Sequence, residues 1–281
     1  MGRPEKKGIV MKIIDAHLHL FQPSPHTEEM VRAVGHESST DHLKKCYEKL
    51  GITAGIVMGN GGLEPELHEY PAPFRYCVGL DRRFWDGKTL PEGTLEKLEA
   101  NLRRKSCVGI KLYPGYLPTP VSDPVYRPVY ELARSYGKPV AVHMGMTAFA
   151  RARLKDCHPL TLDEVAADWP EVQFVMCHFG NPFLADAAAV LEKNPNVAAD
   201  LSGLLEGITD LERYFEAQAG YVSMLRGWIA YVEAPGKFLF GTDFPAVNLE
   251  NYIEFIRRLV PEERHEEIFF DNANRLYGLG L

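Results

Sequence analysis

Two histidines close to the N-terminus, His17 and His19, have the spacing of paired metal ligands. They lie in the segment IIDAHLHLF (13–21), in which polar and apolar residues alternate. This alternation is typical of a β-strand. Successive side chains on a strand point to opposite faces, so the two imidazoles share one side. The residues that alternate with them face an apolar layer on the other side: Ile14, Ala16, Leu18 and Leu20. The pair therefore forms either two corners of a metal site or two unrelated histidines at a strand end.

Four further polar residues end apolar runs later in the chain: Lys111, His143, His178 and Asp243. A lone histidine in such a place is more often a hydrogen-bonded core residue than a ligand. A lone aspartate there can be a turn or cap residue, and a lone lysine can be an ion-pair partner. If these four residues lie beside His17 and His19 in the fold, core packing does not readily explain so many polar groups in one place. We therefore expect a metal centre.

The segments that carry these residues alternate between strand-like and helix-like patterns. Eight short β-type runs occur, at 12–17, 52–59, 74–80, 107–113, 139–143, 172–178, 197–201 and 237–242. Segments with helical signals lie between most of them, and in 125–136 apolar residues recur at spacings of three and four. This alternation implies a parallel sheet with right-handed crossovers. Eight such units in 281 residues favour a single (β/α)8 TIM barrel, and no Gly-x-Gly-x-x-Gly follows the first strand to suggest a dinucleotide-binding sheet.

The active site of such a barrel lies at the carboxyl ends of its strands. The first strand ends in the histidine pair, the fourth in Lys111, the fifth in His143 and the sixth in His178, and the eighth leads into Asp243. Strand alternation supports inward placement of Lys111 and His143, because their apolar neighbours suit the helix layer: Val108, Ile110 and Leu112, and Val140 and Val142.

Several of these segments resemble the amidohydrolase superfamily, and most closely its short amidohydrolase-related branch of metal-dependent hydrolases and decarboxylases. The resemblance lies in DAHLHLF (15–21), GIKLYP (109–114), VAVHMG (140–145), MCHFGNP (176–182), FGTDFP (240–245) and DNANRLYGL (271–279). It runs from about Met11 to the end. We therefore expect one barrel domain at 12–281 after a flexible N-terminal tail at 1–11.

The resemblance implies a role for each matching residue. His17, His19, His143 and Asp243 correspond to the metal ligands, Asp243 also shuttles the proton, and His178 orients the attacking water or polarises the substrate. One divalent metal is implied. Zn²⁺ suits these ligands best, with Mn²⁺ or Fe²⁺ as alternatives, and such an ion can lower the pKa of its water from 15.7 to about 7. Two points stay open. Lys111 either binds a substrate carboxylate or carbonyl or, less favoured, is carboxylated to bridge a second metal. Asp15 is either an acceptor for a ligand's ring nitrogen or a plain hydrogen-bonding residue in the lumen.

Loops after the strands are expected to recognise the substrate. Arginines near a metal pocket suit a small carboxylated molecule, although exposed arginines more often only face solvent. The candidate substrate-binding residues are Lys111, Tyr113, Arg151, Arg153 and Asn181, with Arg82, Arg83, Trp85 and Tyr116 on neighbouring loops. The leading hypothesis is hydrolysis of an amide, lactone or ester of a small organic acid. The alternative is a metal-dependent decarboxylase or hydratase of an aromatic or muconate-type acid, and a binding protein that retains the site is the rival of another class.

Composition limits the partners. A formal charge of −7 argues against a nucleic-acid partner or a nuclease of the same fold. No apolar run approaches the length of about 20 residues of a membrane helix, and residues 1–12 lack the apolar core of a signal peptide. Five cysteines without a Cys-x-x-Cys pair suit free thiols, so we expect a cytoplasmic protein that does not bind membranes. The family resemblance favours a homodimer.

Overall fold

The computed structural model of the chain describes residues 11–82 and 85–281. The predicted tail at 1–11 therefore falls, except for Met11, outside the described residues, and so does Arg83.

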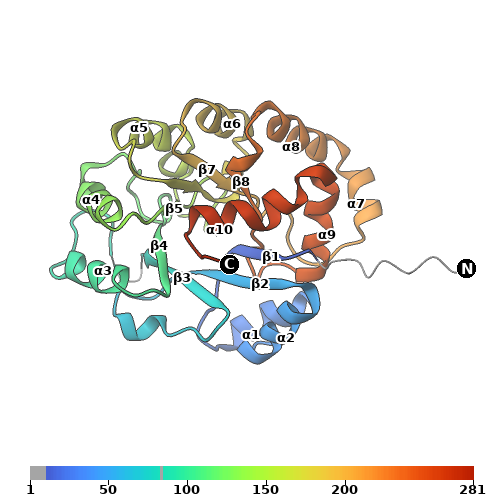
Figure 1. Cartoon of the computed structure of the whole chain (residues 1–281), viewed down its shortest axis with the longest axis horizontal. Coiled ribbons are helices and arrows are strands. Elements are labelled where there is room, and N and C mark those ends of the chain that lie inside the picture. Colours follow the sequence, from blue (N-terminus) through green and yellow to red (C-terminus); the bar gives the residue numbers. More distant parts are fainter. Residues whose placement is uncertain (1–10, 83–84) are drawn as a thin grey trace, which may run out of the picture.

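Eight parallel strands form the centre of the molecule, and each pairs with the next in the order of the sequence (Figure 1). They are β1 (Ile13–Leu18), β2 (Ile52–Met58), β3 (Phe74–Leu80), β4 (Cys107–Leu112), β5 (Val140–Val142), β6 (Phe174–Met176), β7 (Val197–Asp200) and β8 (Phe238–Leu239). Backbone hydrogen bonds close the barrel between β1 and the segment that follows β8, from Ala16 N to Phe240 O at 2.9 Å and, one residue beyond β1, from His19 N to Phe244 O at 2.7 Å. The predicted TIM barrel and the predicted positions of its strands are confirmed.

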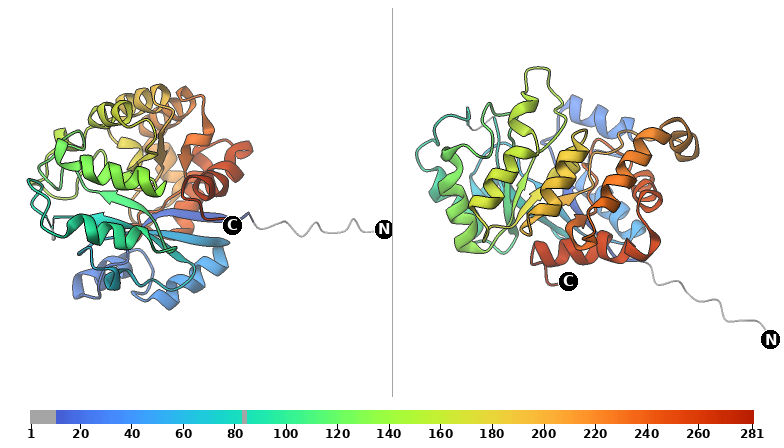
Figure 2. Two further views of the ribbon diagram at one scale, coloured as in Figure 1. Left: turned by 60° about the vertical axis from the view of Figure 1, so that its left-hand side comes forward. Right: turned by 90° about the horizontal axis from the view of Figure 1, so that it is seen from above.

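Helices surround the barrel (Figures 1 and 2). They are α1 (Pro25–Ala33), α2 (Thr40–Leu50), α3 (Thr94–Leu102), α4 (Arg127–Tyr136), α5 (Leu160–Asp168), α6 (Leu184–Lys193), α7 (Leu211–Ala217), α8 (Ala219–Tyr231), α9 (Leu249–Leu259) and α10 (Asn272–Leu276). Side-chain oxygens of Ser24, Ser39 and Asn248 cap α1, α2 and α9 by accepting from backbone N–H groups of the first turn. Within 11–82 and 85–281, no helix combines the length and the apolar character needed to cross a membrane.

Apolar side chains form two separate cores. The larger lies between the strands and the surrounding helices and includes Ile110, Leu112, Val140 and Val142, as their alternation predicted. Val108 belongs instead to the smaller core, because the pairing of β4 with β3 shifts at this residue, so its predicted outward direction was wrong. The smaller draws members from all eight strands, and from none of α1–α9, so it fills the barrel interior. Ala273 and Tyr277 from the C-terminal segment pack in this interior cluster with Ile14, so α10 covers the end at which β1 begins (Figure 2). The carboxyl ends of the strands therefore form the opposite mouth of the barrel.

An irregularity in β1 changes the direction of its side chains. Asp15 pairs with Gly55 and Leu18 with Val57, so three steps along β1 match two along β2. Such a bulge breaks the alternation of faces. Ile14 and Ala16 consequently lie in the barrel interior while Leu18 packs in the outer core. The prediction that Ile14, Ala16 and Leu18 share one apolar face was wrong for this reason.

Candidate active site

The first histidine pair meets Asp243 at the mouth of the barrel. His17 Nε2 and His19 Nε2 each lie 3.4 Å from the same carboxylate oxygen, Oδ1 of Asp243. His17 is fully buried, and the side chains of His19 and Asp243 are 14% and 24% exposed. The three side chains thus converge on one point, which is open to solvent on one side.

Asp200 at the end of β7 holds the other side of His17. Its Oδ2 lies 2.9 Å from His17 Nδ1, and its Oδ1 accepts from the backbone N–H of His178 at 2.9 Å. The contact to Nδ1 places the proton of a neutral His17 on that nitrogen and leaves Nε2 with a lone pair that faces Asp243. Our sequence interpretation missed Asp200. The signal was available, since a lone carboxylate ends the apolar run 197–200 at the same end of the barrel as the histidines.

His19 is positioned by the end of β2. Its Nδ1 lies 2.9 Å from Asn60 Oδ1 and 3.1 Å from the carbonyl oxygen of Met58, so both partners accept its ring proton. Asn60 Nδ2 in turn donates to the hydroxyl of Tyr113 at 3.0 Å, and that hydroxyl donates to Gly59 O at 3.1 Å. Tyr113 is 7% exposed and reaches the site through Asn60. Direct contact between Tyr113 and a substrate stays a prediction.

His143 and His178 complete the ring of imidazoles. The ring of His178 lies 4.8 Å from that of His17 and 5.0 Å from that of His143, centroid to centroid. Ser202, a second residue that the sequence interpretation missed, contacts His178 through Oγ, 2.9 Å from Nδ1. The ring of Tyr116 packs against His143 at a centroid distance of 4.8 Å. All five residues predicted to form the site therefore meet at one mouth of the barrel.

The backbone is strained where these residues are presented. Outside glycine, the described residues with positive φ are His178 (60°), Phe179 (46°) and Asp243 (62°), directly after β6 and close after β8. Non-glycine residues adopt this region at an energetic cost, and such strain gathers at functional sites. Gly203 leaves the space that they need, because a Cβ there would lie 2.9 Å from His178 Nδ1.

Burial and mutual charge set the protonation of the site. Burial lowers the pKa of His17 to about 4, despite the opposing charge of Asp200. Burial, followed by the charges of His178 and Lys111, holds the pKa of His143 well below its usual value. For Asp243 burial acts upward, but His178 and the hydrogen bond from His19 outweigh it and hold its pKa well below the ordinary range. At neutral pH, His17 and His143 are therefore neutral imidazoles with a free lone pair, and Asp243 is a carboxylate.

Asp15 does not contact a ring nitrogen. Its carboxylate accepts from Thr242 N at 2.9 Å, from Thr242 Oγ1 at 2.7 Å and from the Tyr47 hydroxyl at 2.9 Å. The bulge in β1 turns Asp15 away from the histidines, so the interpretation of this residue as a partner of a ligand ring was wrong. Asp200 holds that place, and Asp15 instead joins β1 to the segment that presents Asp243.

Lys111 lies inside the barrel beneath the histidines. It is 1% exposed, and its Nζ donates to Cys177 Sγ at 2.7 Å and lies 5.3 Å from the ring centre of Tyr113. The predicted inward direction is therefore correct. Its charge helps to lower the pKa of His17 and His143, after the effect of burial.

The predicted substrate-binding residues in the loops differ in their position. Asn181 follows His178, and its Oδ1 is buried without a hydrogen-bond partner among the described residues. Arg151 and Arg153 are exposed, and among the described residues neither forms an ion pair with Asp200 or Asp243 of the site. Nearer to His143, Tyr116 packs edge-on to Phe149 at 5.5 Å, and the guanidinium of Arg82 lies 4.3 Å from the centre of the Phe149 ring.

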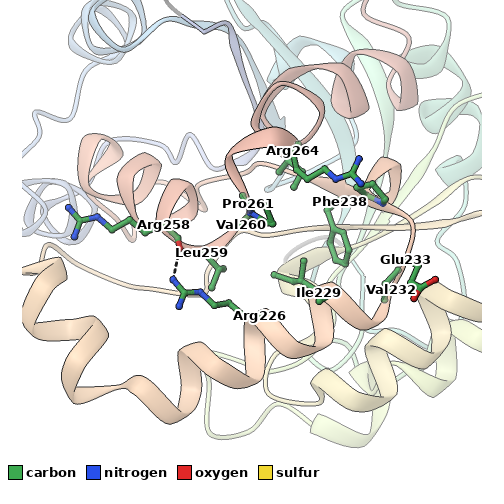
Figure 3. Close-up of a pocket in the computed structure, with 13 residues that line it drawn as sticks. Arg226, Ile229, Val232, Glu233, Phe238, Arg258, Leu259, Val260, Pro261 and Arg264 are labelled. Carbon is green, nitrogen blue, oxygen red and sulfur yellow. Dashed lines mark hydrogen bonds between the residues drawn. The ribbon is translucent and has the colours of Figure 1, made fainter.

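A separate pocket of about 590 Å³ lies between α8, α9 and the segment that leads into β8 (Figure 3). Its arginines are engaged within the protein: Arg226 Nη2 donates to Arg258 O, Arg258 pairs with Glu254, and Arg264 pairs with Glu267. None of the residues that line it belongs to the histidine site. This pocket is therefore separate from the candidate active site at the barrel mouth.

The residues at the barrel mouth fit a divalent metal. His17 Nε2 and His143 Nε2 are buried and make no hydrogen bond in the described part of the chain. A buried nitrogen without a partner is energetically unfavourable, and a bound cation would supply that partner. The groups that contain His17, His19 and Asp243, or His17, His178 and Asp200, bring three donor atoms within 4.8 Å of one another. Nitrogen and carboxylate oxygen are ligands that Zn²⁺ and Mn²⁺ accept.

Known structures share this architecture. A TIM-barrel protein from Bordetella bronchiseptica superimposes with a TM-score of 0.69 at 19% identity, covering 95% of this chain and 98% of its own. An amidohydrolase from Burkholderia multivorans with bound zinc gives 0.67 at 17% identity, covering 95% of this chain and 99% of its own. A dihydroxybenzoic acid decarboxylase from Polaromonas with bound manganese gives 0.64 at 12% identity, covering 96% and 98%. These identities support the fold alone.

The sequence itself carries the family assignment. No curated protein matches the chain. The amidohydrolase family model, however, matches residues 14–279, which include every residue of the site and the whole barrel sheet except Ile13 at the start of β1. The chain belongs to the amidohydrolase family.

Proposed function

We propose that the protein is a metal-dependent hydrolase in which His17, His19, His143 and Asp243 hold one divalent cation. The observation that carries this proposal is the pair of 3.4 Å distances from Asp243 Oδ1 to His17 Nε2 and His19 Nε2. Two ligands at about 2.0–2.1 Å from a tetrahedral Zn²⁺ lie about 3.4 Å apart. The observed distances from Asp243 Oδ1 to the two histidine nitrogens therefore equal those expected between ligands of one Zn²⁺.

The chemistry divides between the metal and the chain. When bound, the metal would supply Lewis acidity toward a water molecule and toward the carbonyl oxygen of the substrate. Asp243 is ionised and open to solvent, so its carboxylate can accept the proton of the attacking water and pass it to the leaving group. His178 lies beside His17 on a strained backbone whose N–H donates to Asp200, and its ring nitrogen Nδ1 contacts Ser202 Oγ. This suits His178 to orient the water or polarise the substrate.

The loops favour a small organic acid as substrate. Phe149 and Tyr116 form an aromatic wall near His143, and Arg82 lies against that wall. An aromatic surface and a guanidinium together suit a planar or apolar molecule that carries a carboxylate. Arg151 and Arg153 are further cations that could bind the carboxylate. Oδ1 of Asn181, which has no partner among the described residues, could accept a hydrogen bond from another group of the substrate. The bond cleaved would be an amide, lactone or ester.

Decarboxylation of an aromatic acid is the second candidate. The same aromatic wall favours it, and so does the structural similarity to dihydroxybenzoate decarboxylases from Rhizobium and Polaromonas. Such a reaction would use Asp243 and the same metal ligands, so the position of these residues does not separate the two reactions.

Metal analysis followed by a substrate panel tests both reactions. The purified protein is expected to contain one equivalent of divalent metal at the barrel mouth, here called the catalytic equivalent. The variant His17→Ala is expected to lose it. The metal-loaded protein is then given small lactones, amides, esters and aromatic carboxylic acids while acid release and CO₂ are measured. Acid release without CO₂ supports hydrolysis, and CO₂ release supports decarboxylation. If His17→Ala kept both metal and activity, the ligand assignment would be refuted.

A further inference from the structure

A second cluster of metal-binding side chains lies away from the barrel mouth, on α2 and the turn before it. Cys46 Sγ lies 3.3 Å from His42 Nε2 and 3.9 Å from His36 Nδ1, and the two histidine nitrogens lie 3.2 Å apart. All three side chains are half-buried, so solvent ions can reach them. The proposed catalytic mechanism uses none of these residues.

We propose that His36, His42 and Cys46 bind a second cation of the zinc class. For bond lengths of about 2.0–2.1 Å to nitrogen and 2.3 Å to sulfur, tetrahedral ligands lie about 3.4 Å (N to N) and about 3.6 Å (N to S) apart. The three observed distances differ from these values by a few tenths of an ångström. A thiolate with two imidazoles selects a borderline or soft cation over Mg²⁺ or Ca²⁺. A water molecule would complete the four ligands, because the three side chains are only half-buried.

The fold positions His42 and Cys46 with little rearrangement. They are four residues apart on α2, so they lie one above the other on one face of the helix. Ser39 fixes the start of that helix, because its Oγ accepts from the N–H of His42 at 3.1 Å. Glu37 lies 3.9 Å from His42 Nδ1, which favours the proton on Nδ1 and leaves the lone pair of Nε2 directed at the cluster.

His36 must change its tautomer when the cation binds. Its Nε2 accepts from the backbone N–H of Leu249 at 3.2 Å, so the neutral ring carries its proton on Nδ1, toward His42. Coordination through Nδ1 moves this ring proton to Nε2 and breaks the bond from Leu249. The thiol of Cys46 loses its proton to solvent as the metal–sulfur bond forms. The balance is one proton released for each cation bound.

Titration with Co²⁺ tests this site in the full-length protein. After removal of metal with a chelator, Co²⁺ is added while absorbance and proton release are recorded. A thiolate–cobalt charge-transfer band is expected from this site, since the proposed catalytic ligands include no sulfur. The band should accompany a second equivalent of cobalt beyond the catalytic one and the release of about one proton per cation at this site.

Variants separate the two sites. Cys46→Ser and His42→Ala are each expected to lose the band and the second equivalent, with the catalytic equivalent retained. His17→Ala should keep the band. His26→Ala, which removes an exposed histidine on α1, is the matched control and should titrate as the wild type does. Thermal melting of each variant beforehand shows that it is folded. Absence of a thiolate band in the wild type, or its persistence in Cys46→Ser, would overturn the proposal.

Discussion

Two histidine clusters in this molecule have similar spacing but different support. At the barrel mouth, His17 and His19 lie in β1 and directly after it, and Asp243 lies in the segment after β8. Hydrogen bonds hold the ring nitrogens of both histidines and the backbone of Asp243. On α2, His42 and Cys46 share one helix, and the third member, His36, lies in a turn with its ring nitrogen engaged by Leu249.

The difference lies in what each cluster costs the fold. At the mouth, positive φ at His178 and Asp243 and buried ring nitrogens without partners are unfavourable, and the surrounding sheet supports them. In the α2 cluster, His42 and Cys46 have ordinary helical backbone, and the side chains of His36, His42 and Cys46 are half-buried. Rigid, strained and partly desolvated groups suit catalysis, whereas a helix face suits an ion that binds without reaction. Substitutions in the two clusters should therefore have unequal effects.

The largest effect is expected from Asp243→Asn. The amide cannot accept the proton of water, so kcat on the substrate found by the panel should fall about 10²- to 10⁴-fold. Steady-state kinetics measure this effect. Asp163→Asn, which removes a carboxylate paired with Lys193 on the outer helices, serves as control and should retain activity. Activity of Asp243→Asn near the wild-type level would exclude Asp243 as the proton acceptor.

Asp200→Asn should have a smaller effect, because Asp200 acts through His17. Loss of the carboxylate at Nδ1 weakens the hold on the tautomer that presents the Nε2 lone pair, and metal affinity or activity should fall about 10- to 100-fold. Competition with a chelator measures the affinity of the catalytic site. The thiolate–cobalt band of the α2 cluster should not change. An equal loss at both sites would instead indicate general damage to the fold.

Metal binding should stabilise the protein at both clusters. A cation at 100 times its Kd stabilises the folded state by about 2.7 kcal/mol per site, provided that it does not bind the unfolded chain. His17→Ala should lose the stabilisation that comes from metal bound at the barrel mouth. Cys46→Ser should lose the stabilisation that comes from metal bound at the α2 cluster. Urea unfolding with and without Zn²⁺ measures both contributions. If His17→Ala kept the full stabilisation, no cation would be bound at the barrel mouth.

The smallest effect concerns His68, a buried histidine whose ring nitrogens have partners. Its Nε2 donates to Gly62 O at 3.0 Å, its ring stacks on Tyr76, and burial lowers its pKa despite that hydrogen bond. A lowered pKa means that the unfolded chain binds the proton first. The contribution of His68 to stability is therefore present above about pH 6.5 and is lost as pH falls toward its folded pKa.

Urea unfolding between pH 5 and pH 8 checks this sign. His68→Gln should show a shallower loss of stability below about pH 6.5 than the wild type, with Zn²⁺ affinity unchanged. An identical pH profile for the two proteins would show that other groups cause the loss. His68 thus serves as a reference for His17 and His143, whose Nε2 atoms make no hydrogen bond among the described residues.

Local patterns in the sequence were sufficient for much of this description. Alternating strand and helix segments predicted the eight-stranded barrel, because periodicity and turn residues act over short distances. Polar residues that end apolar runs predicted the mouth of the barrel, since parallel strands bring their carboxyl ends together. His17, His19, His143, His178 and Asp243 meet there as expected.

Contacts between distant segments were decided by tertiary structure alone. The bulge in β1 depends on its register with β2, and it turns Asp15 toward Tyr47. Asp200, which lies 183 residues after His17, holds the ring of His17 instead. The α2 cluster likewise needs the turn that brings His36 back over the helix. A sequence pattern records which side chains one strand or helix can present. Which of them touch, and which nitrogen keeps its proton, depends on packing between elements.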